Sequence, residues 1–422
     1  MEVFDAVESE VRAYCRHWPT VFARAQGSIL LDEHGRSFID FFAGASALNY
    51  GHNHPALQEA LIQYVLRDGI VHGLDMATTA KRAFLEALTD IVLGPRNLEY
   101  KVQFPGPAGV NAVEAALRLA RKATGRDRVL GFDGGFHGMA AGALQVSDHH
   151  HGGYTCTPNA GSIPFDNHTA TLEPGHFENA VLRLGVAPDQ VAAVIVEVVQ
   201  GEGGVRTARR SWLAALEVFC RTYDILIVVD DIQAGCGRTG PFLSFEHHGI
   251  DPDIVCLSKS ISGYGLPLSL LLLRPSLDVW RPGEHNGTFR GNNLAFVTGA
   301  MALNLFWVDG QLQQATERRE NSIRNRLRSL ADRRPDVVRG ISGCGMFWGV
   351  QMSNSIVAAA VRQAAFDHGL LLETCGATGD VLKIIPPLTI ADEELDCGLS
   401  VLEECVALAA RFEEGINDCT LV

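Results

Sequence analysis

Three features are scarce or missing in this sequence of 422 residues: basic charge, closely spaced cysteines and long apolar runs. The formal net charge of −14 leaves no basic stripe that could displace counterions from phosphates, so no nucleic-acid partner is expected. The longest apolar stretch, around LPLSLLLL, is too short to span a bilayer, and the start shows no signal-peptide pattern. We therefore expect a cytoplasmic protein that acts on small molecules and has no membrane partner.

Metal and nucleotide motifs are also missing. The ten cysteines include no C-x-x-C pair, which argues against a zinc site or a disulfide framework. The cluster Asp148 to His151 has metal-binding residue types, but it is flanked by glycines without supporting ligands, so a solvated loop is favoured. Neither a G-x-x-x-x-G-K-[ST] loop nor a G-x-G-x-x-G fingerprint occurs, which weakens a nucleotide-binding hypothesis.

What the sequence does contain predicts a compact α/β protein. Its composition is 47% apolar with 43 glycines, and the runs VAAVIVEVV, ILIVVDD and DIVCLS are typical of parallel strands covered on both faces. We expect a large, mainly parallel-sheet domain over 56–310. An N-terminal arm over 1–55, with short strands around a turn at residues 33–35, precedes it, and a smaller α+β domain over 311–422 follows.

Lysine is rare enough for each one to be considered individually. Lys81, Lys101 and Lys122 suit surface positions, whereas Lys259 ends the apolar run IVCLS and enters the glycine-bearing turn SISGYG. Ligands of open α/β sheets bind beyond the carboxyl ends of the strands, and a desolvated lysine there becomes a nucleophile. A lone lysine after a strand is more often structural, so its neighbours decide the interpretation.

A second strand end supplies carboxylates. The run ILIVV ends in Asp230 and Asp231, and a buried acid is costly unless it is paired. A suitable partner is the protonated pyridine nitrogen of pyridoxal 5'-phosphate (PLP), and Asp230 is the candidate because it is nearest the strand. The alternative is a strand-end pair satisfied by loop amides.

Two glycine-containing turns complete the pattern. In KVQFPGPAGVNAVEAALRLARKATG a turn delivers backbone amides at a helix start, where Gly109 permits close approach of a phosphate. In GFDGGFHGM, Phe136 could cover one face of a planar cofactor. Each signal is weak alone, because any strand-to-helix turn resembles the first, and Phe136 by itself would be a core residue.

Combined in this order, the motifs resemble the class III, fold-type I aminotransferases over nearly the whole chain. The matching segments are the pattern from Gly27 to Asp40, the Gly51-His52 and Pro55 turn, EVVQGEGG, DDIQAGCGRTG, SKSISGYGLP, HNGTFRGNN and PPLTI. The last five are especially similar to the branch that exchanges amino groups between diaminobutyrate and 2-oxoglutarate. The resemblance implies a PLP enzyme that moves an amino group from glutamate to the aldehyde of aspartate 4-semialdehyde, giving 2,4-diaminobutyrate.

The resemblance also implies roles for the matching positions and an active site shared between the two subunits of a homodimer. Lys259 is implied to form the Schiff base and shuttle the proton, and Asp230 to contact the pyridine nitrogen. Gln233 is implied to contact the ring hydroxyl and Phe136 to stack on the ring. The implied phosphate-binding residues are Gly109, Val110 and the partner subunit's Thr288.

Three residues are implied to contact the substrate. Glu202 matches a gate residue that pairs with a basic side chain and moves aside for a dicarboxylate. Glu197 matches a pocket carboxylate, and turn hydrogen bonds are an equally good interpretation of it. Lys383 stands where class III members commonly carry an arginine for the α-carboxylate, and lysine binds as a point charge without arginine's bidentate fork.

Two further departures leave other functions open. The phosphate turn PAGVNAVE lacks the threonines usual in the diaminobutyrate branch, and Phe347 and Trp348 replace smaller or polar residues. These changes could suit a larger substrate and a PLP-dependent β- or γ-elimination or replacement, for example on a compound like S-adenosylmethionine. They could also be neutral repacking. A third hypothesis is a non-enzymatic binding subunit, against which Lys259 and Asp230 argue.

Overall fold

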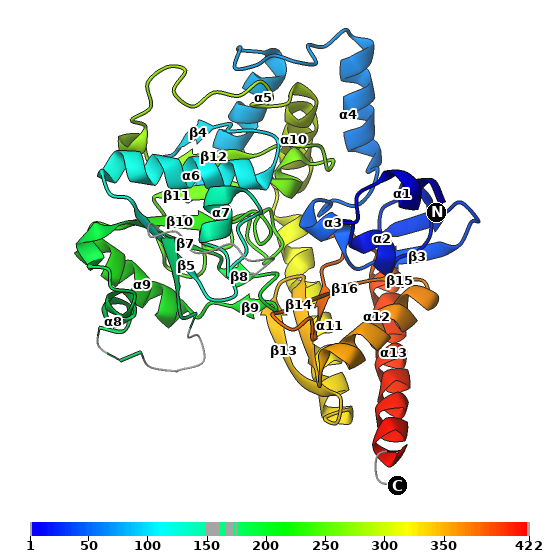
Figure 1. The fold of residues 1–422 in the computed structure, drawn as a ribbon. Coiled ribbons are helices and arrows are strands. Elements are labelled where there is room, and N and C mark those ends of the chain that lie inside the picture. Colours follow the sequence, from blue (N-terminus) through cyan, green and yellow to red (C-terminus); the bar gives the residue numbers. More distant parts are fainter. Residues whose placement is uncertain (1, 149–159, 166–171, 174, 420–422) are drawn as a thin grey trace.

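A seven-stranded sheet dominates the computed structural model, which describes residues 2–148, 160–165, 172–173 and 175–419 (Figure 1). In spatial order its strands are β4 (Lys101–Gln103), β12 (Leu270–Leu273), β11 (Ile254–Leu257), β10 (Leu226–Asp230), β7 (Val191–Val196), β5 (Arg128–Phe132) and β6 (Ala160–Ile163). Only β12 runs antiparallel to its neighbours. The predicted large, mainly parallel sheet is confirmed.

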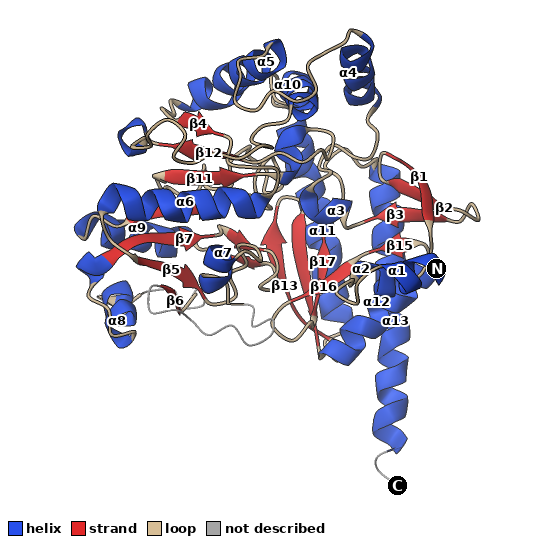
Figure 2. Cartoon of the chain, turned by 45° about the horizontal axis from the view of Figure 1, so that its top comes forward, coloured by secondary structure: helices blue, strands red, loops and turns tan. Residues whose placement is uncertain are grey.

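Helices cover both faces of this sheet, because its strands are apolar on both sides (Figure 2). Val228 and Ile254 pack in the cluster of α6, whereas Ile227 and Val255 pack in the cluster that contains α9. The helices of this region are α4 (Pro55–Leu66), α5 (Thr79–Ala87), α6 (Gly109–Thr124), α7 (Ala141–Gln145), α8 (His176–Arg183), α9 (Arg210–Thr222) and α10 (Asn293–Phe306). Short 3-10 or π turns are η1 (Leu88–Leu93), η2 (Gly94–Arg96), η3 (Pro188–Gln190), η4 (Lys259–Ser262) and η5 (Pro275–Leu277).

The N-terminal residues form a second sheet that a late segment of the chain completes. Its order is β1 (Phe22–Gln26), β2 (Ile29–Asp32), β3 (Ser37–Asp40) and β15 (Leu370–Leu371), and β15 pairs in parallel with β3. The turn between β2 and β3 lies where the sequence predicted one. Asp32 closes it, since its Oδ1 accepts the amides of His34 at 3.0 Å and Arg36 at 2.8 Å. The helices α1 (Glu2–Val7), α2 (Tyr14–His17) and α3 (Ala43–Ser46) flank this sheet.

The C-terminal part forms an antiparallel sheet with long helices, as expected for an α+β unit. The order is β13 (Val338–Cys344), β14 (Phe347–Met352), β17 (Val381–Ile384) and β16 (Glu373–Cys375), with α11 (Gln311–Arg333), α12 (Ser355–Asp367) and α13 (Asp392–Cys419). A two-stranded ribbon of β8 (Val199–Gln200) and β9 (Arg206–Thr207) lies close to it. The predicted domain boundaries at residues 55 and 310 stay predictions.

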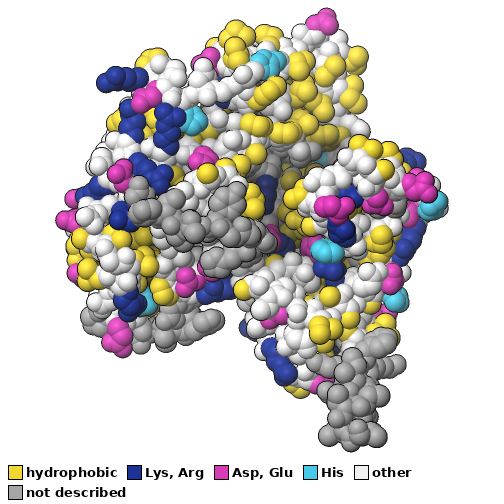
Figure 3. Space-filling model, viewed as in Figure 1, with side chains coloured by type: hydrophobic (Ala, Val, Ile, Leu, Met, Phe, Trp, Pro, Cys, Tyr) yellow, Lys and Arg dark blue, Asp and Glu magenta, His cyan; other side chains and the backbone are white. Residues whose placement is uncertain are grey.

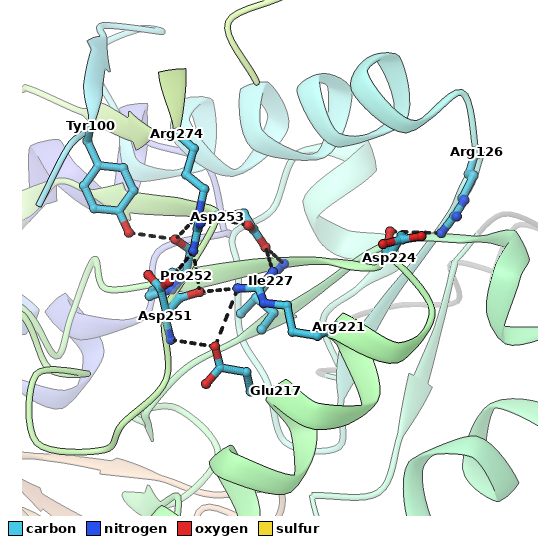
Figure 4. Close-up of polar contacts among 10 residues, drawn as sticks. All are labelled: Tyr100, Arg126, Glu217, Arg221, Asp224, Ile227, Asp251, Pro252, Asp253 and Arg274. Atoms are coloured by element: carbon cyan, nitrogen blue, oxygen red, sulfur yellow. Dashed lines mark hydrogen bonds and ion pairs between the residues drawn. The ribbon is translucent and has the colours of Figure 1, made fainter. Parts of the chain in front are cut away.

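Matched charges fix the amino-terminal edge of the large sheet (Figure 4). Asp253 is buried, and its two oxygens contact Arg221 Nη1 at 2.7 Å and Arg274 Nε at 3.1 Å. The backbone amide of Ile227, at the start of β10, donates to the same carboxylate at 2.8 Å. This network holds the loops that enter β10 and β11. It therefore fixes the starts of both strands.

Within the described part of the chain, no helix combines the length and the apolar character needed to cross a bilayer.

Candidate active site

The carboxyl ends of four parallel strands place the predicted residues at one edge of the sheet. Lys259 lies two residues after β11, Asp230 ends β10, Glu197 follows β7, and Phe136 lies on the loop after β5. Lys259 has a φ of 53°, a left-handed conformation that is rare outside glycine. A strained backbone of this kind persists where the surrounding structure fixes it, as at functional sites.

Charges converge on the Lys259 amine. Burial is the main cause that lowers its pKa, and the opposing charge of Glu202 limits the fall, to about 8. The positive charge of Lys383 lowers the pKa further, whereas Asp230 and Glu197 raise it. An amine with this pKa is neutral far more often at neutral pH than an exposed lysine, so it can act as a nucleophile or accept a proton.

Asp230 is buried against His137. Its Oδ2 lies 2.8 Å from His137 Nδ1, and its Oδ1 accepts the amide of Ile232 at 3.2 Å. Burial disfavours the imidazolium, but the hydrogen bond and charge of Asp230 outweigh burial and raise the pKa of His137. The pair therefore places a buried carboxylate in hydrogen-bond contact with an imidazole, and such an acid is a suitable partner for a protonated ring nitrogen.

The carboxylate of Glu197 accepts hydrogen bonds from the backbone. Its Oε2 accepts the amide of Phe136 at 3.0 Å, and its Oε1 accepts the amide of Gly201 at 3.4 Å. Burial raises the pKa of Glu197 to about 7, although the charge of His137 opposes this shift. These are the turn hydrogen bonds that the sequence allowed as an alternative to substrate binding.

Glu202 and Lys383 form an ion pair beside Lys259. The Lys383 side chain is 1% exposed and the Glu202 side chain 25%. Burial opposes the charge on both, but their mutual attraction prevails, since the pKa of Glu202 is lowered and that of Lys383 raised. Lys383 lies on β17, directly opposite Gly349 of β14 and Glu373 of β16.

The start of α6 provides a cradle at the predicted phosphate position. The N-cap residue Ala108 has no side chain that could cap the helix, and its carbonyl accepts the amide of Asn111 at 2.9 Å, so the amides of Gly109 and Val110 receive no side-chain cap from it. A Cβ added at Gly109 would lie 3.1 Å from Ile232, and one at Gly138 would lie 2.7 Å from Val110. Both glycines thus allow a close approach of backbone segments to this helix start.

A left-handed turn joins the N-terminal segment to this edge. Residues 43–46 all have positive φ, between 47° and 70°. Ser260 Oγ donates to the carbonyl of Ser46 at 2.6 Å, and Gln233 Nε2 donates to that of Ala45 at 3.3 Å. The neighbour of Lys259 and the predicted ring-hydroxyl contact therefore both hold the strained turn.

The remaining predicted residues are distributed less tightly. Thr288 is exposed on the loop before α10, where its carbonyl lies 3.0 Å from His72 Nε2. Phe347 and Trp348 are both buried, and Phe347 would lie 2.9 Å from a Cβ added at Gly201. Residues 149–151 of the histidine cluster lie outside the described residues. Among the residues that are described, no His, Cys, Asp or Glu side chains gather as a metal site.

Sequence reasoning noted His137 only as the neighbour of Phe136 and assigned it no role. The available signal was its place on the glycine-containing loop after β5, next to Phe136. Its contact with Asp230 spans 93 residues, and only the order of strands in the sheet brings the two together.

Comparisons with known proteins agree with this geometry. The family model described as aminotransferase class-III matches residues 12–406. Diaminobutyrate–2-oxoglutarate transaminases from Streptomyces anulatus and Nocardia farcinica are each 53% identical to this chain, covering 96% and 95% of it and 97% and 92% of their own lengths. The ornithine aminotransferase of Toxoplasma gondii, solved with partial occupancy of PLP at its active site, superposes with a TM-score of 0.83 at 28% identity, covering 98% of this chain and 94% of its own.

Proposed function

The chain belongs to the class-III aminotransferases, and on this basis we propose that it transfers an amino group from glutamate to aspartate 4-semialdehyde, giving 2-oxoglutarate and 2,4-diaminobutyrate. The observation that carries the proposal is the convergence of Asp230, Glu202 and Lys383 on the Lys259 amine. The substrates are those named for the relatives that are about half identical over almost the whole chain.

The residues present fit PLP, the cofactor of this family. The uncapped helix start with its two tightly placed glycines suits the phosphate, and the buried Asp230 suits the ring nitrogen. When bound, PLP supplies an aldehyde that captures amines and a ring that accepts electrons from the substrate's α carbon. Lys259 would hold it through Nζ, Phe136 would cover the ring, Gln233 would contact its hydroxyl, and Gly109 and Val110 would bind the phosphate.

The chain's own residues then divide the proton chemistry. Lys259 Nζ, released when the donor's amine takes its place, would remove the proton from the donor's α carbon. The pKa of about 8 leaves this amine able to accept and then return a proton. Asp230, held by His137, would keep the ring nitrogen protonated throughout.

The Glu202–Lys383 pair would select between the two substrates. Paired with Glu202, Lys383 is neutralised, and the pocket suits an aldehyde with a cationic α-amino group. When Glu202 moves aside, Lys383 would meet a carboxylate of glutamate as a point charge. The sequence also predicted Glu197 as a substrate contact. In that role, its replacement would raise the KM for glutamate.

A homodimer with shared sites is part of the proposal. The side chains Ile62, Val65 and Leu66 of α4 are exposed, and Phe289 next to Thr288 is 65% exposed. Figure 3 shows apolar side chains gathered in its upper part, where Figure 1 places α4. Such a surface marks a protein contact. A second copy bound there would bring the partner subunit's Thr288 to the phosphate. We also propose a cytoplasmic location, because eight of the described cysteines are free thiols. The large cofactor-binding domain is proposed to cover 56–310.

A single-turnover experiment tests the proposal. The protein loaded with PLP and given glutamate alone should release one equivalent of 2-oxoglutarate per active site, and adding aspartate 4-semialdehyde should then yield 2,4-diaminobutyrate. Lys259→Ala should lose the visible absorption band of the bound cofactor and release nothing. A Lys259-dependent band without release of 2-oxoglutarate would overturn the glutamate donor, and release of a side-chain leaving group would favour elimination or replacement.

A further inference from the structure

Both oxygens of Glu197 are engaged by backbone amides. Oε2 accepts from Phe136 and Oε1 from Gly201, and the residue is 7% exposed. A carboxylate that binds a substrate must keep at least one oxygen available to it. Glu197 instead joins the loop after β5 to the turn after β8.

Each of these two segments carries a residue with a place in the proposed chemistry. The loop after β5 carries Phe136, proposed to cover the cofactor ring. The turn after β8 carries Glu202, the partner of Lys383. Gly201 leaves no room for a side chain, since a Cβ there would lie 1.6 Å from Gln233 Oε1.

The electrostatic setting supports the same interpretation. Glu197 and Asp230 both act on buried His137, and the charge of His137 in turn favours an ionised Glu197. Burial has the larger effect and raises the pKa of Glu197 to about 7. The two amide donors and the charge of His137 favour the charged form and limit the rise that burial causes.

We propose that Glu197 is a positioning residue, which ties the ring-covering loop at Phe136 to the turn that carries Glu202 and does not bind the substrate. The proposal rests on the PLP function proposed above. Loss of Glu197 should therefore change how the cofactor is bound. It should slow both half-reactions equally, because the same loop and turn serve both substrates.

The test replaces the acceptor oxygens while keeping the size of the side chain. In Glu197→Gln one oxygen becomes an NH2 group, which cannot accept an amide hydrogen bond. Changes to a residue that orients a functional ligand typically cost 10- to 100-fold, so we expect PLP affinity and kcat to fall by about 10-fold or more. The visible circular dichroism of the bound cofactor should change, and the KM values for glutamate and for the aldehyde should each change less than about 3-fold.

Asp32→Asn is the matched control. Asp32 lies in the turn between β2 and β3, where its Oδ1 accepts two backbone amides and its Oδ2 accepts the Thr20 hydroxyl at 3.0 Å, so Asn removes one acceptor oxygen here as well. This variant should lose thermal stability and keep the cofactor dichroism of the wild type. A dichroism change shared by both variants would show a general loosening and overturn the positioning role.

Two other outcomes also decide the question. A KM for glutamate raised 10-fold or more, with unchanged dichroism, would make Glu197 a substrate ligand and overturn the proposal. If Glu197→Gln does not fold, Glu197→Asp keeps two acceptor oxygens on a shorter stem, and its dichroism should lie between those of the wild type and the apoprotein. Dichroism equal to the wild type would count against the proposal. A wild-type protein that binds no PLP would instead refute the function itself.

Discussion

At the amino-terminal ends of β10 and β11, Asp253 lies between two arginines (Figure 4). At the carboxyl-terminal ends of the same strands, burial disfavours the charge of Lys259. Burial lowers the pKa of Arg221, but Asp253 more than compensates, so the pKa is raised. At the other edge burial wins, and the pKa of Lys259 falls to about 8. The charges at the amino-terminal edge stabilise the fold. At the carboxyl-terminal edge, burial brings the pKa of Lys259 close to neutral pH, where its amine can gain or lose a proton.

The largest effect should come from neutralising the acid at the reactive edge. In Asp230→Asn the amide cannot balance a protonated ring nitrogen, and His137 loses its anionic partner. We expect kcat to fall about 1000-fold, within the usual range for losing a group that controls a proton, with little loss of thermal stability. Steady-state kinetics and a melting curve check this. A fall of less than 10-fold would mean that Asp230 has no such role.

The next largest effect concerns stability at the opposite edge. Asp253→Ala leaves Arg221 and Arg274 without their shared carboxylate and removes the acceptor of the Ile227 amide. The loss should be about 2–3 kcal/mol in the free energy of unfolding, as for buried hydrogen bonds to charged groups, measured by urea unfolding. The dichroism of bound PLP should stay unchanged in the folded variant. A changed spectrum at normal stability would show that the two edges are not independent.

Replacing Asp231, which is buried beside Asp230, should change stability by an amount that depends on pH. Burial raises the pKa of Asp231 to about 7, although Ser244 opposes the shift, and its Oδ1 has no hydrogen-bond partner. Because the folded pKa lies above the unfolded one, this group's contribution is fully present below about pH 4 and is lost as the pH rises through 7. The stability of Asp231→Asn should therefore rise relative to that of the wild type as the pH increases from 4 to 8. Parallel stability curves of the two proteins would contradict this.

The smallest effect is expected at the exposed rim of the matched network. Asp251 pairs with Arg274 at 2.5 Å, but its side chain is 64% exposed. Exposed ion pairs contribute little, so Asp251→Ala should cost less than about 1 kcal/mol. Comparing its unfolding midpoint with that of Asp253→Ala separates burial from charge. Equal losses in the two variants would show that pairing alone sets the stability of this edge.

Local sequence signals were sufficient for the main strands and for the position of Lys259 and Asp230 at their carboxyl ends. The apolar runs before Asp230 and Lys259 form β10 and β11, and parallel order brings their ends to one edge. The segment after residue 310 forms the long helix α11, which agrees with the α+β unit expected over 311–422. These features depend on neighbours in the chain, which a sequence displays directly.

Contacts between distant segments were not predictable in the same way. Arg238 is fully buried, and it donates to the carbonyls of Met346 and Pro386 and to Asn49 Oδ1. Nothing in the run CGRTG indicates three partners from separate parts of the chain. The same holds for Glu197, whose two interpretations differ only in which groups lie next to its oxygens.

The pairing of β15 with β3 has a consequence for how the chain is made. Ile39 donates its amide to Gly369, and so the sheet begun in the first forty residues is finished about 330 residues later. At 5–20 residues per second this interval lasts roughly half a minute, during which the edge of β3 is unpaired on the nascent chain. An unpaired edge is a template for wrong pairing. Newly made protein should therefore depend on shielding of its N-terminal segment far more than the folded enzyme does.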